Sequence, residues 1–276
     1  SGSTHQRLGA SLAEEMDAEF CGVVNRHFPD GERYIRVLMD VNEQDVVVVQ
    51  NTFPDKKIVE LLLILQAVKE AGAKTVTCVI PYMGYSRQER IFQSGEARSA
   101  KAIASVIGGM CDRVFTINVH TPEILKFFGC EANDINGSRE VVRYLKGFGP
   151  DMVIAPDEGS RDRCTLAADL LKVPVHVMKK VRIDGRTVET SSGQINVKGS
   201  TAVILDDIIS TGGTIATAAN ILREGGAERV FAACTHGLFI EDAANRLRVC
   251  DDILSSDTLE GVYTRFSVAP AIADAL

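Results

Sequence analysis

Short runs of apolar residues alternate along the chain with segments in which apolar residues recur every three or four positions. Residues 46–49 form the first clear run, and apolar positions at helical spacing follow between Ile58 and Val68. A run of apolar, β-branched residues predicts a buried strand, whereas the longer period predicts an amphipathic helix. We expect Asp55 to cap this helix and Gly72 to end it.

The alternation continues through the rest of the chain. Further runs that predict strands lie at residues 75–80, 113–117, 152–155, 173–178, 202–205 and 230–234. Strands that are apolar throughout, and not only at every second position, are typical of a parallel sheet covered on both faces by helices. The sequence therefore predicts an α/β fold with mainly parallel sheets.

An approximate internal repeat indicates that this pattern is built twice. Residues 68–76 align without gaps to residues 222–230, across the end of a helix, a glycine turn and the start of a strand. A chain of 276 residues also holds about two domains at about 150 residues each. We therefore expect two similar α/β domains, residues 1–137 and residues 138–267, with residues 268–276 packing back on the first.

Charge and cysteine content narrow the possible classes of protein. The formal net charge of −7 argues against a general nucleic-acid binder, since such proteins usually present a basic surface. No apolar run approaches the roughly 18 residues of a membrane span, and the first residues show no signal-peptide pattern. Seven cysteines, odd in number and widely spaced, disfavour a disulfide framework and a zinc site. We expect a protein of the reducing cytoplasm.

The strongest chemical signal follows the predicted strand at residues 202–205. Two adjacent carboxylates come at its carboxyl end and precede a loop of small residues that leads into a helix. Glycines let backbone N–H groups approach a ligand, and a helix N-terminus favours an anion. The carboxylates suit sugar hydroxyls, so the segment fits ribose 5-phosphate; a capped strand-to-helix turn without a ligand is the plainer alternative. The candidate ligand-binding residues are Asp206, Asp207, Ser210, Thr211, Gly212, Gly213 and Thr214.

This segment resembles the phosphoribosyl pyrophosphate (PRPP) binding motif of type I phosphoribosyltransferases and PRPP synthases. The rest of the chain resembles PRPP synthases, the ribose-phosphate diphosphokinases, from end to end, and the archaeal-type branch is the most similar. The matching pieces follow the family's order and are residues 1–6 (SGSTHQ), 28–32 (FPDGE), 81–90 (PYMGYSRQER), 99–101 (SAK), 119–120 (VH), 156–157 (PD), 180–182 (KVR) and 235–237 (THG).

The resemblance implies a specific reaction. Members of the family transfer the diphosphoryl group of ATP to the anomeric hydroxyl of ribose 5-phosphate, which yields PRPP and AMP. Such a transfer depends on positioning and charge neutralisation, and Mg²⁺ is the expected cofactor. We expect two type I phosphoribosyltransferase-like domains, with ATP on the N-terminal domain and ribose 5-phosphate on the C-terminal domain, the two substrates meeting between them.

The resemblance assigns ATP binding to two groups of residues. Arg87 and Gln88 follow a predicted strand, where an arginine offers a planar fork of donors to phosphate oxygens; taken alone, they are also compatible with a surface loop. Phe28, Asp30 and Glu32 resemble a loop that holds the adenine and is often contributed by a neighbouring subunit, although this segment is also a good turn. A borrowed loop implies a homo-oligomer, at least a dimer.

The resemblance also assigns metal ligands and catalytic cations. His120 and Asp157 each follow a predicted strand and correspond to family residues at Mg²⁺, although a lone histidine in an apolar context is more often a core residue. Lys180 and Arg182 open a polar connection at residues 179–200, whose length indicates a flap over a site. The family uses this pair to stabilise the transition state; without the resemblance, they would be solvated surface charges.

Departures from the family pattern leave alternatives open. Residues 158–160 (EGS) replace the usual Ala-Gly-Gly after the aspartate, and Asn118 replaces an aspartate two residues before His120. A catalytically silent PRPP-synthase-associated subunit is therefore one alternative, which the retained histidine and cation pair oppose. A PRPP-consuming phosphoribosyltransferase is another, but it does not explain Arg87 or the second α/β half.

Overall fold

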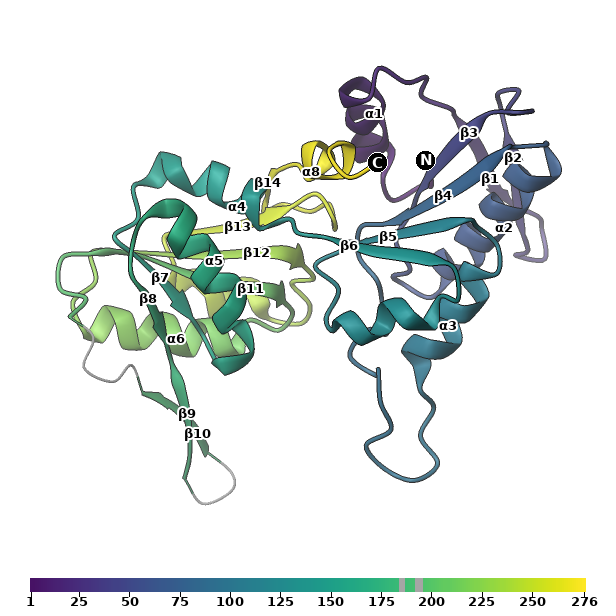
Figure 1. Ribbon diagram of the computed structural model, residues 1–276. Coiled ribbons are helices and arrows are strands. Elements are labelled where there is room, and N and C mark those ends of the chain that lie inside the picture. Colours follow the sequence, from purple (N-terminus) through teal and green to yellow (C-terminus); the bar gives the residue numbers. More distant parts are fainter. Residues whose placement is uncertain (184–186, 192–195) are drawn as a thin grey trace. The chain divides into compact units, whose positions relative to one another are not determined.

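The chain divides into two compact units (Figure 1). Unit 1 comprises residues 1–136 and 269–276, and unit 2 comprises residues 137–268. These bounds differ by one residue from the domains expected from the sequence. The computed structural model describes residues 1–183, 187–191 and 196–276, and for residues 179–183 and 187–191 it describes the backbone alone.

Unit 1 is built on a parallel sheet of four strands in the order β3-β4-β5-β6. Alternate strand residues, such as Val48, Cys78 and Val114, form a core with the apolar faces of α2 and α3. An antiparallel hairpin of β1 and β2 packs against α2, and α1 contacts the short C-terminal helix α8. The elements of unit 1 are α1 (Gln6–Glu15), β1 (Val23–His27), β2 (Arg33–Val37), β3 (Asp45–Val49), α2 (Lys56–Glu70), β4 (Thr75–Ile80), α3 (Ser99–Gly108), β5 (Arg113–Ile117), the 3₁₀ helix η1 (Pro122–Phe127), β6 (Glu131–Ile135) and α8 (Ala269–Ala273).

Unit 2 contains a six-stranded sheet in the order β14-β13-β12-β11-β7-β8, in which all neighbours are parallel. One face packs on α4 and α5, where Val203 meets Ala167, and the other packs on α6, where Ile204 meets Leu222. Consecutive residues of β11 therefore enter two different cores, which explains why this strand is apolar throughout. The elements are α4 (Ser138–Leu145), η2 (Lys146–Phe148), β7 (Met152–Ala155), η3 (Glu158–Ser160), α5 (Arg161–Leu171), β8 (Val175–Val177), β9 (Lys179–Ile183), β10 (Thr187–Ser191), β11 (Thr201–Ile209), α6 (Gly213–Glu224), β12 (Arg229–Gly237), α7 (Ala243–Arg246), η4 (Leu247–Val249), β13 (Asp252–Ser256) and β14 (Thr264–Phe266).

These two sheets confirm the predicted α/β fold with mainly parallel strands. The strands expected at residues 75–80, 113–117 and 152–155 coincide with β4, β5 and β7 at both ends. The strand expected at residues 173–178 is shorter, because β8 begins only after Pro174, whose nitrogen cannot donate to a neighbouring strand. The polar connection that follows contains an antiparallel hairpin of β9 and β10, which the sequence pattern did not predict.

The ends of α2 confirm one expectation and correct another. Gly72 has a φ of +84° directly after the helix, a conformation that glycine adopts without a steric penalty. Asp55 occupies the N-cap position of α2, but its side chain makes no capping hydrogen bond. The carboxylate instead accepts a hydrogen bond of 2.7 Å from the hydroxyl of Tyr85. The expected cap was therefore wrong, because a tertiary contact occupies the side chain.

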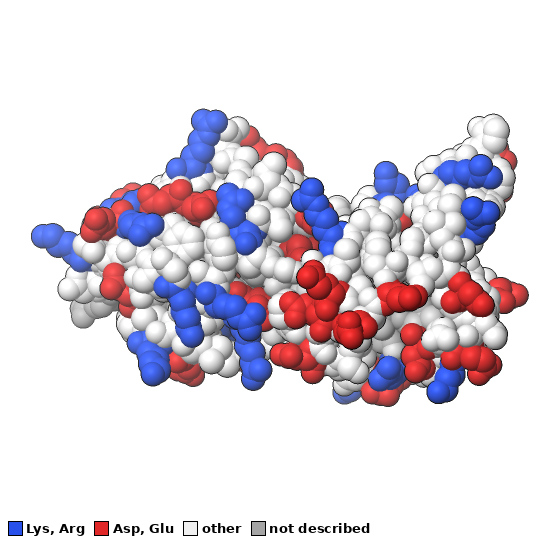
Figure 2. Space-filling model, turned by 90° about the horizontal axis from the view of Figure 1, so that it is seen from above, with Lys and Arg blue, Asp and Glu red and all other residues white. Residues whose placement is uncertain are grey.

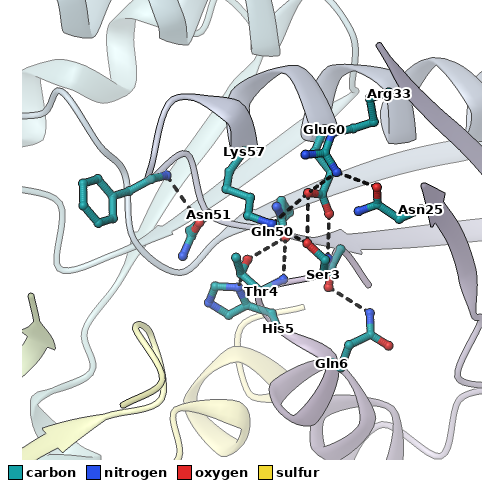
Figure 3. Close-up of polar contacts among 12 residues, drawn as sticks. Ser3, Thr4, His5, Gln6, Asn25, Arg33, Gln50, Asn51, Lys57 and Glu60 are labelled. Atoms are coloured by element: carbon teal, nitrogen blue, oxygen red, sulfur yellow. Dashed lines mark hydrogen bonds and ion pairs between the residues drawn. The ribbon is translucent and has the colours of Figure 1, made fainter. Parts of the chain in front are cut away.

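Unit 1 buries a carboxylate in the first turns of α2 (Figure 3). Glu60 is fully buried, and its Oε2 lies 3.0 Å from Lys57 Nζ and 3.1 Å from Arg33 Nη1. Ser3 donates its backbone N–H and its hydroxyl to the two carboxylate oxygens, at 2.7 and 2.9 Å. Burial by itself raises the pKa of Glu60, but these donors outweigh it and leave that pKa below its ordinary value. The carboxylate thus links the first residues, the β1–β2 hairpin and α2.

Two further features of the described residues are the length of the helices and the distribution of charge on one face. None of the helices in the described ranges is both long and apolar enough to span a bilayer. On the face drawn in Figure 2, basic and acidic side chains of the described residues are interspersed, and no continuous basic surface covers it.

Replacing Glu60 by Gln should destabilise unit 1 by about 3 kcal/mol at pH 7, because two cations then lose their buried partner. A carboxyl whose folded pKa is depressed stabilises the fold above its unfolded pKa, and this contribution disappears as the pH falls through the folded pKa. The difference between variant and wild type should therefore shrink as the pH falls through the folded pKa of Glu60, which lies below its ordinary value. Thermal unfolding at pH 7 and at a series of decreasing acidic pH values measures both effects. Glu70→Gln, an exposed change on the same helix, is the control, and equal losses in the two variants would contradict the prediction.

Candidate active site

Strand β11 presents the two predicted carboxylates in the middle of the sheet of unit 2. Asp206 and Asp207 lie within the strand, which continues to Ile209, so the sheet backbone fixes both of them. Strand β7 pairs with β11 in parallel and ends at Ala155, and Asp157 follows two residues later. The carboxyl ends of neighbouring parallel strands meet at one edge of a sheet, where open α/β folds bind their ligands.

An arginine and a serine that sequence reasoning missed hold these carboxylates. Arg163 Nη1, from α5, lies 2.9 Å from Asp206 Oδ1 and 3.1 Å from Asp207 Oδ1, so one guanidinium bridges the pair. The hydroxyl of Ser160 donates to Asp206 Oδ1 at 2.8 Å. The available signal was the spacing: Asp157, Ser160 and Arg163 recur every three residues into the start of a helix, which places them on one face.

The electrostatics of this pair reflect its burial. Removal from water, followed by the negative charge of Asp207, raises the pKa of Asp206 to about 7, although Ser160 and Arg163 oppose the shift. A carboxylate that is costly to desolvate gains from any hydroxyl donor or cation that approaches it. The pair is therefore suited to accept hydrogen bonds from a polyhydroxylated ligand or to bind a cation.

The loop after β11 is a tight glycine turn that leads directly into the N-terminus of α6. Gly212 has a φ of +75°, and a Cβ there would meet Leu247 Cγ at 3.0 Å, so both backbone and space require glycine. The loop is anchored by Arg246 Nη1, which donates to Thr211 O at 3.0 Å, and by Ile240 N–H, which donates to Ser210 O at 3.1 Å. Helix α6 then begins at residue 213, with its first N–H groups available to an anion. The remaining predicted residues of this loop, Gly213 and Thr214, form the first turn of α6.

Asp157 lies beside the same carboxylates. Its Oδ1 accepts a hydrogen bond from the backbone N–H of Ser160 at 3.2 Å, and the hydroxyl oxygen of Ser160 lies 3.2 Å from the same Oδ1. The first short turn after β7 is therefore closed by this aspartate, and the turn leads directly into α5. The structure thus brings together Asp157 and the whole of the predicted segment from Asp206 to Thr214 within unit 2.

The predicted ATP residues lie in two loops of unit 1. Arg87 is exposed in the loop after β4. The side-chain amide of Gln88 donates to Glu96 Oε2 at 3.2 Å, so this glutamine serves the loop itself. Phe28 and Asp30 lie in the tight turn between β1 and β2, where Asp30 Oδ1 accepts the backbone N–H of Glu32 at 3.0 Å.

That turn leaves an aromatic ring available. Phe28 is 45% exposed, and apart from an edge-on contact with Tyr34 its ring faces solvent. Asp30 and Glu32 are also exposed. The segment is thus a turn, as one interpretation of the sequence held, and it also presents the aromatic and acidic groups that the other interpretation required.

His120 lies in the loop after β5 and is exposed, so it is not a core histidine. The preceding residue Val119 donates its backbone N–H to Asp134 Oδ1 at 2.9 Å, and Thr116 donates its hydroxyl to the same oxygen at 2.6 Å. A carboxylate on β6 therefore holds the histidine loop, and it lies 16 residues downstream of Asn118, where sequence reasoning did not look for it.

The predicted catalytic cations lie on the β9–β10 hairpin. Lys180 pairs with Thr190 and Arg182 pairs with Val188 across its two strands. The two residues alternate with Val181, so they share one face of the hairpin. Their side chains lie outside what the structure describes.

Comparisons with known proteins agree along the whole chain. Residues 1–110 match the model of the N-terminal domain of ribose phosphate pyrophosphokinase, and residues 136–268 match that of the phosphoribosyl transferase domain. Ribose-phosphate pyrophosphokinase of Methanopyrus kandleri is 39% identical over 277 residues, which cover 98% of this chain and 95% of that protein. The protein of the same name from Methanothermobacter thermautotrophicus is 39% identical over 99% of this chain and 98% of its own.

A solved structure shows the same fold. The crystal structure of phosphoribosylpyrophosphate synthetase from Mycobacterium smegmatis is similar, with a TM-score of 0.85 at 29% identity over 99% of this chain and 95% of that one. Both halves of the chain, and the order of their motifs, are therefore those of one group of proteins. The chain belongs to the ribose-phosphate pyrophosphokinase family.

Proposed function

We propose that the protein is a PRPP synthase that transfers the diphosphoryl group of ATP to the anomeric hydroxyl of ribose 5-phosphate, giving PRPP and AMP. The observation that carries the proposal is the arrangement at the end of β11. A buried pair of carboxylates and the N-terminus of α6 are separated by a short glycine turn. Ribose 5-phosphate carries hydroxyl groups at one end and a phosphate at the other. The carboxylates can accept hydrogen bonds from the hydroxyl groups, and the N-terminus of α6 can bind the phosphate.

In this proposal the sugar lies along the segment from Asp206 to Thr214. The two carboxylates accept hydrogen bonds from the ribose hydroxyls, and the turn donates backbone N–H groups to the 5-phosphate. The hydroxyls of Ser210, Thr211 and Thr214 add donors for the phosphate oxygens. Because the loop is anchored to Arg246 and to Ile240 before a ligand arrives, little ordering is needed on binding.

ATP is assigned to unit 1 on the strength of exposed groups of suitable chemistry. Arg87 offers a guanidinium to the phosphates, and Gln88 supports the loop that carries it. Phe28 provides a free aromatic face on which a purine can stack, with Asp30 and Glu32 as acceptors for its amino group. In the proposal this turn comes from a neighbouring copy, so the active form is a homo-oligomer, at least a dimer.

Mg²⁺ is proposed as the cofactor, held by His120 and Asp157. The described residues contain no group of three His, Cys, Asp or Glu side chains that could hold a metal. Mg²⁺ does not require such a group, because proteins hold it by one or two ligands together with substrate phosphates. The bound ion supplies charge neutralisation on the phosphate oxygens. Asp157, fixed by Ser160, contributes a carboxylate oxygen of the type this ion prefers.

Lys180 and Arg182 are proposed to stabilise the transferring group. Their place on a hairpin that projects from the main sheet of unit 2 supports this role, since such an element can cover a bound substrate (Figure 1). Cations aimed at the charge that develops on the phosphoryl oxygens lower the barrier without covalent chemistry.

A cytoplasmic location is also proposed, in keeping with seven cysteines, none of which forms a disulfide.

A catalytically silent subunit is the second candidate, and Ser160 and Asn118 are the departures that favour it. Incubation of the protein with ATP, Mg²⁺ and ribose 5-phosphate should release AMP and form PRPP in equal amounts, as measured by chromatography. A pure protein that binds both substrates and releases no AMP would instead be the silent subunit. Consumption of added PRPP together with a nucleobase would identify a phosphoribosyltransferase.

Replacing Asp206 or Asp207 by Asn should weaken ribose 5-phosphate binding by about 10- to 100-fold, since hydrogen bonds to a charged acceptor contribute about 1.5–3 kcal/mol. The affinity for ATP should change by less than about twofold. Calorimetric titration with each substrate gives both values. Asp169→Asn, on the exposed side of α5, is the matched control. Equal weakening of the two substrates would place the sugar elsewhere.

Replacing Lys180 by Ala should lower kcat by at least about 100-fold, because a preorganised charge at a transition state contributes about 2.7–4 kcal/mol. The KM for ATP should change little, since the proposed contact forms mainly in the transition state. Steady-state kinetics with a coupled AMP assay separate the two parameters. Lys179→Ala, one position earlier on β9, is the control and should retain activity. Similar losses in both variants would refute a specific role for Lys180.

A further inference from the structure

Ser160 stands where the family pattern leads one to expect glycine, and its side chain does more than fill space. The residue is 1% exposed and ends the turn between β7 and α5. A buried hydroxyl must find a partner or lose free energy. Its hydroxyl lies within hydrogen-bonding distance of two carboxylates of the candidate site, which makes the departure from the family pattern a feature of the site itself.

The backbone and side chain of Ser160 hold two different aspartates. Its N–H donates to Asp157 Oδ1 at 3.2 Å, and its hydroxyl donates to Asp206 Oδ1 at 2.8 Å. The hydroxyl oxygen also lies 3.2 Å from Asp157 Oδ1, but a hydroxyl has a single proton, and the shorter contact to Asp206 takes it. One residue therefore joins the carboxylate that follows β7 to the carboxylate within β11.

The contacts of Asp206 converge on one of its two oxygens. Oδ1 accepts from the Ser160 hydroxyl, from Arg163 Nη1 and from the backbone N–H of Asp207, at 2.8, 2.9 and 2.9 Å. The side chain of Asp206 is 17% exposed, so part of the carboxylate stays accessible to a ligand. Three donors on one oxygen fix the rotation of the carboxylate.

We propose that Ser160 is a positioning residue that orients Asp206 toward the ribose hydroxyls and ties it to Asp157 at the proposed cation. This inference rests on the proposed function of the same site. A glycine in its place would keep the backbone bond to Asp157 and lose the hydroxyl, so Arg163 would hold the side chain of Asp206 without the second side-chain donor. The Ser160 hydroxyl therefore strengthens the binding of ribose 5-phosphate and leaves the affinity for ATP unchanged.

The test compares Ser160→Ala with wild type, and Ser200→Ala serves as control. Ser200 is also buried in unit 2, but its hydroxyl donates only to the nearby Val197 O, at 2.7 Å, at the other end of β11. Ser160→Ala should raise the Kd for ribose 5-phosphate by about 10-fold in the presence of Mg²⁺, as the loss of one hydrogen bond to a charged group. Its Kd for ATP should change by less than about twofold, and Ser200→Ala should leave both unchanged.

Isothermal titration gives these constants without turnover, and thermal unfolding shows that the variants are folded. Steady-state kinetics should place the same loss in the KM for ribose 5-phosphate rather than in that for ATP. Equal changes for both ligands, or no change, would overturn the role of Ser160 while leaving the proposed reaction intact. A wild-type protein that releases no AMP, yet binds ribose 5-phosphate more tightly than Ser160→Ala, would overturn the reaction and support the role of Ser160. A wild-type protein that binds no ribose 5-phosphate would overturn both.

Discussion

The bridge between Arg163 and the two adjacent carboxylates of β11 is the interaction on which the ligand site depends. Two acidic side chains at consecutive positions of a buried strand repel each other and resist removal from water. A single guanidinium within 2.9 and 3.1 Å of both offsets that cost and sets their positions. The strand can then end in a loop of small residues that turns into α6. Without the bridge, two adjacent carboxylates would face each other in a largely buried position with no neutralising charge from Arg163, which would raise the free energy of the fold.

Much of this fold could be predicted from periodicity alone. Strand β11 is apolar on both faces because its consecutive residues enter two cores, and this produces the unbroken run at residues 202–205. The β9–β10 hairpin could not be predicted, since its sequence is mostly polar and shows no clear strand pattern. The cap by Asp55 failed because Tyr85, distant in the sequence, takes its carboxylate. Local patterns do not reveal such tertiary partners.

The candidate site also contains residues that the sequence predicts and residues that it does not. The segment from Asp206 to Thr214 could be predicted because its chemistry is continuous along the chain and its strand, turn and helix are all local. Ser160 and Arg163 could not, since their role exists only once β7 and β11 lie side by side. Asp134 was missed for the same reason: it holds the loop of His120 from the neighbouring strand. Residues that position others are visible only in three dimensions.

A crystal structure of the protein with ribose 5-phosphate tests the central claim most directly. The account predicts the phosphate at the first turn of α6, within hydrogen-bonding distance of the backbone N–H groups around Gly212, and ribose hydroxyls on Asp206 and Asp207. Electron density for the sugar phosphate at any other position, with this turn unoccupied, would contradict it.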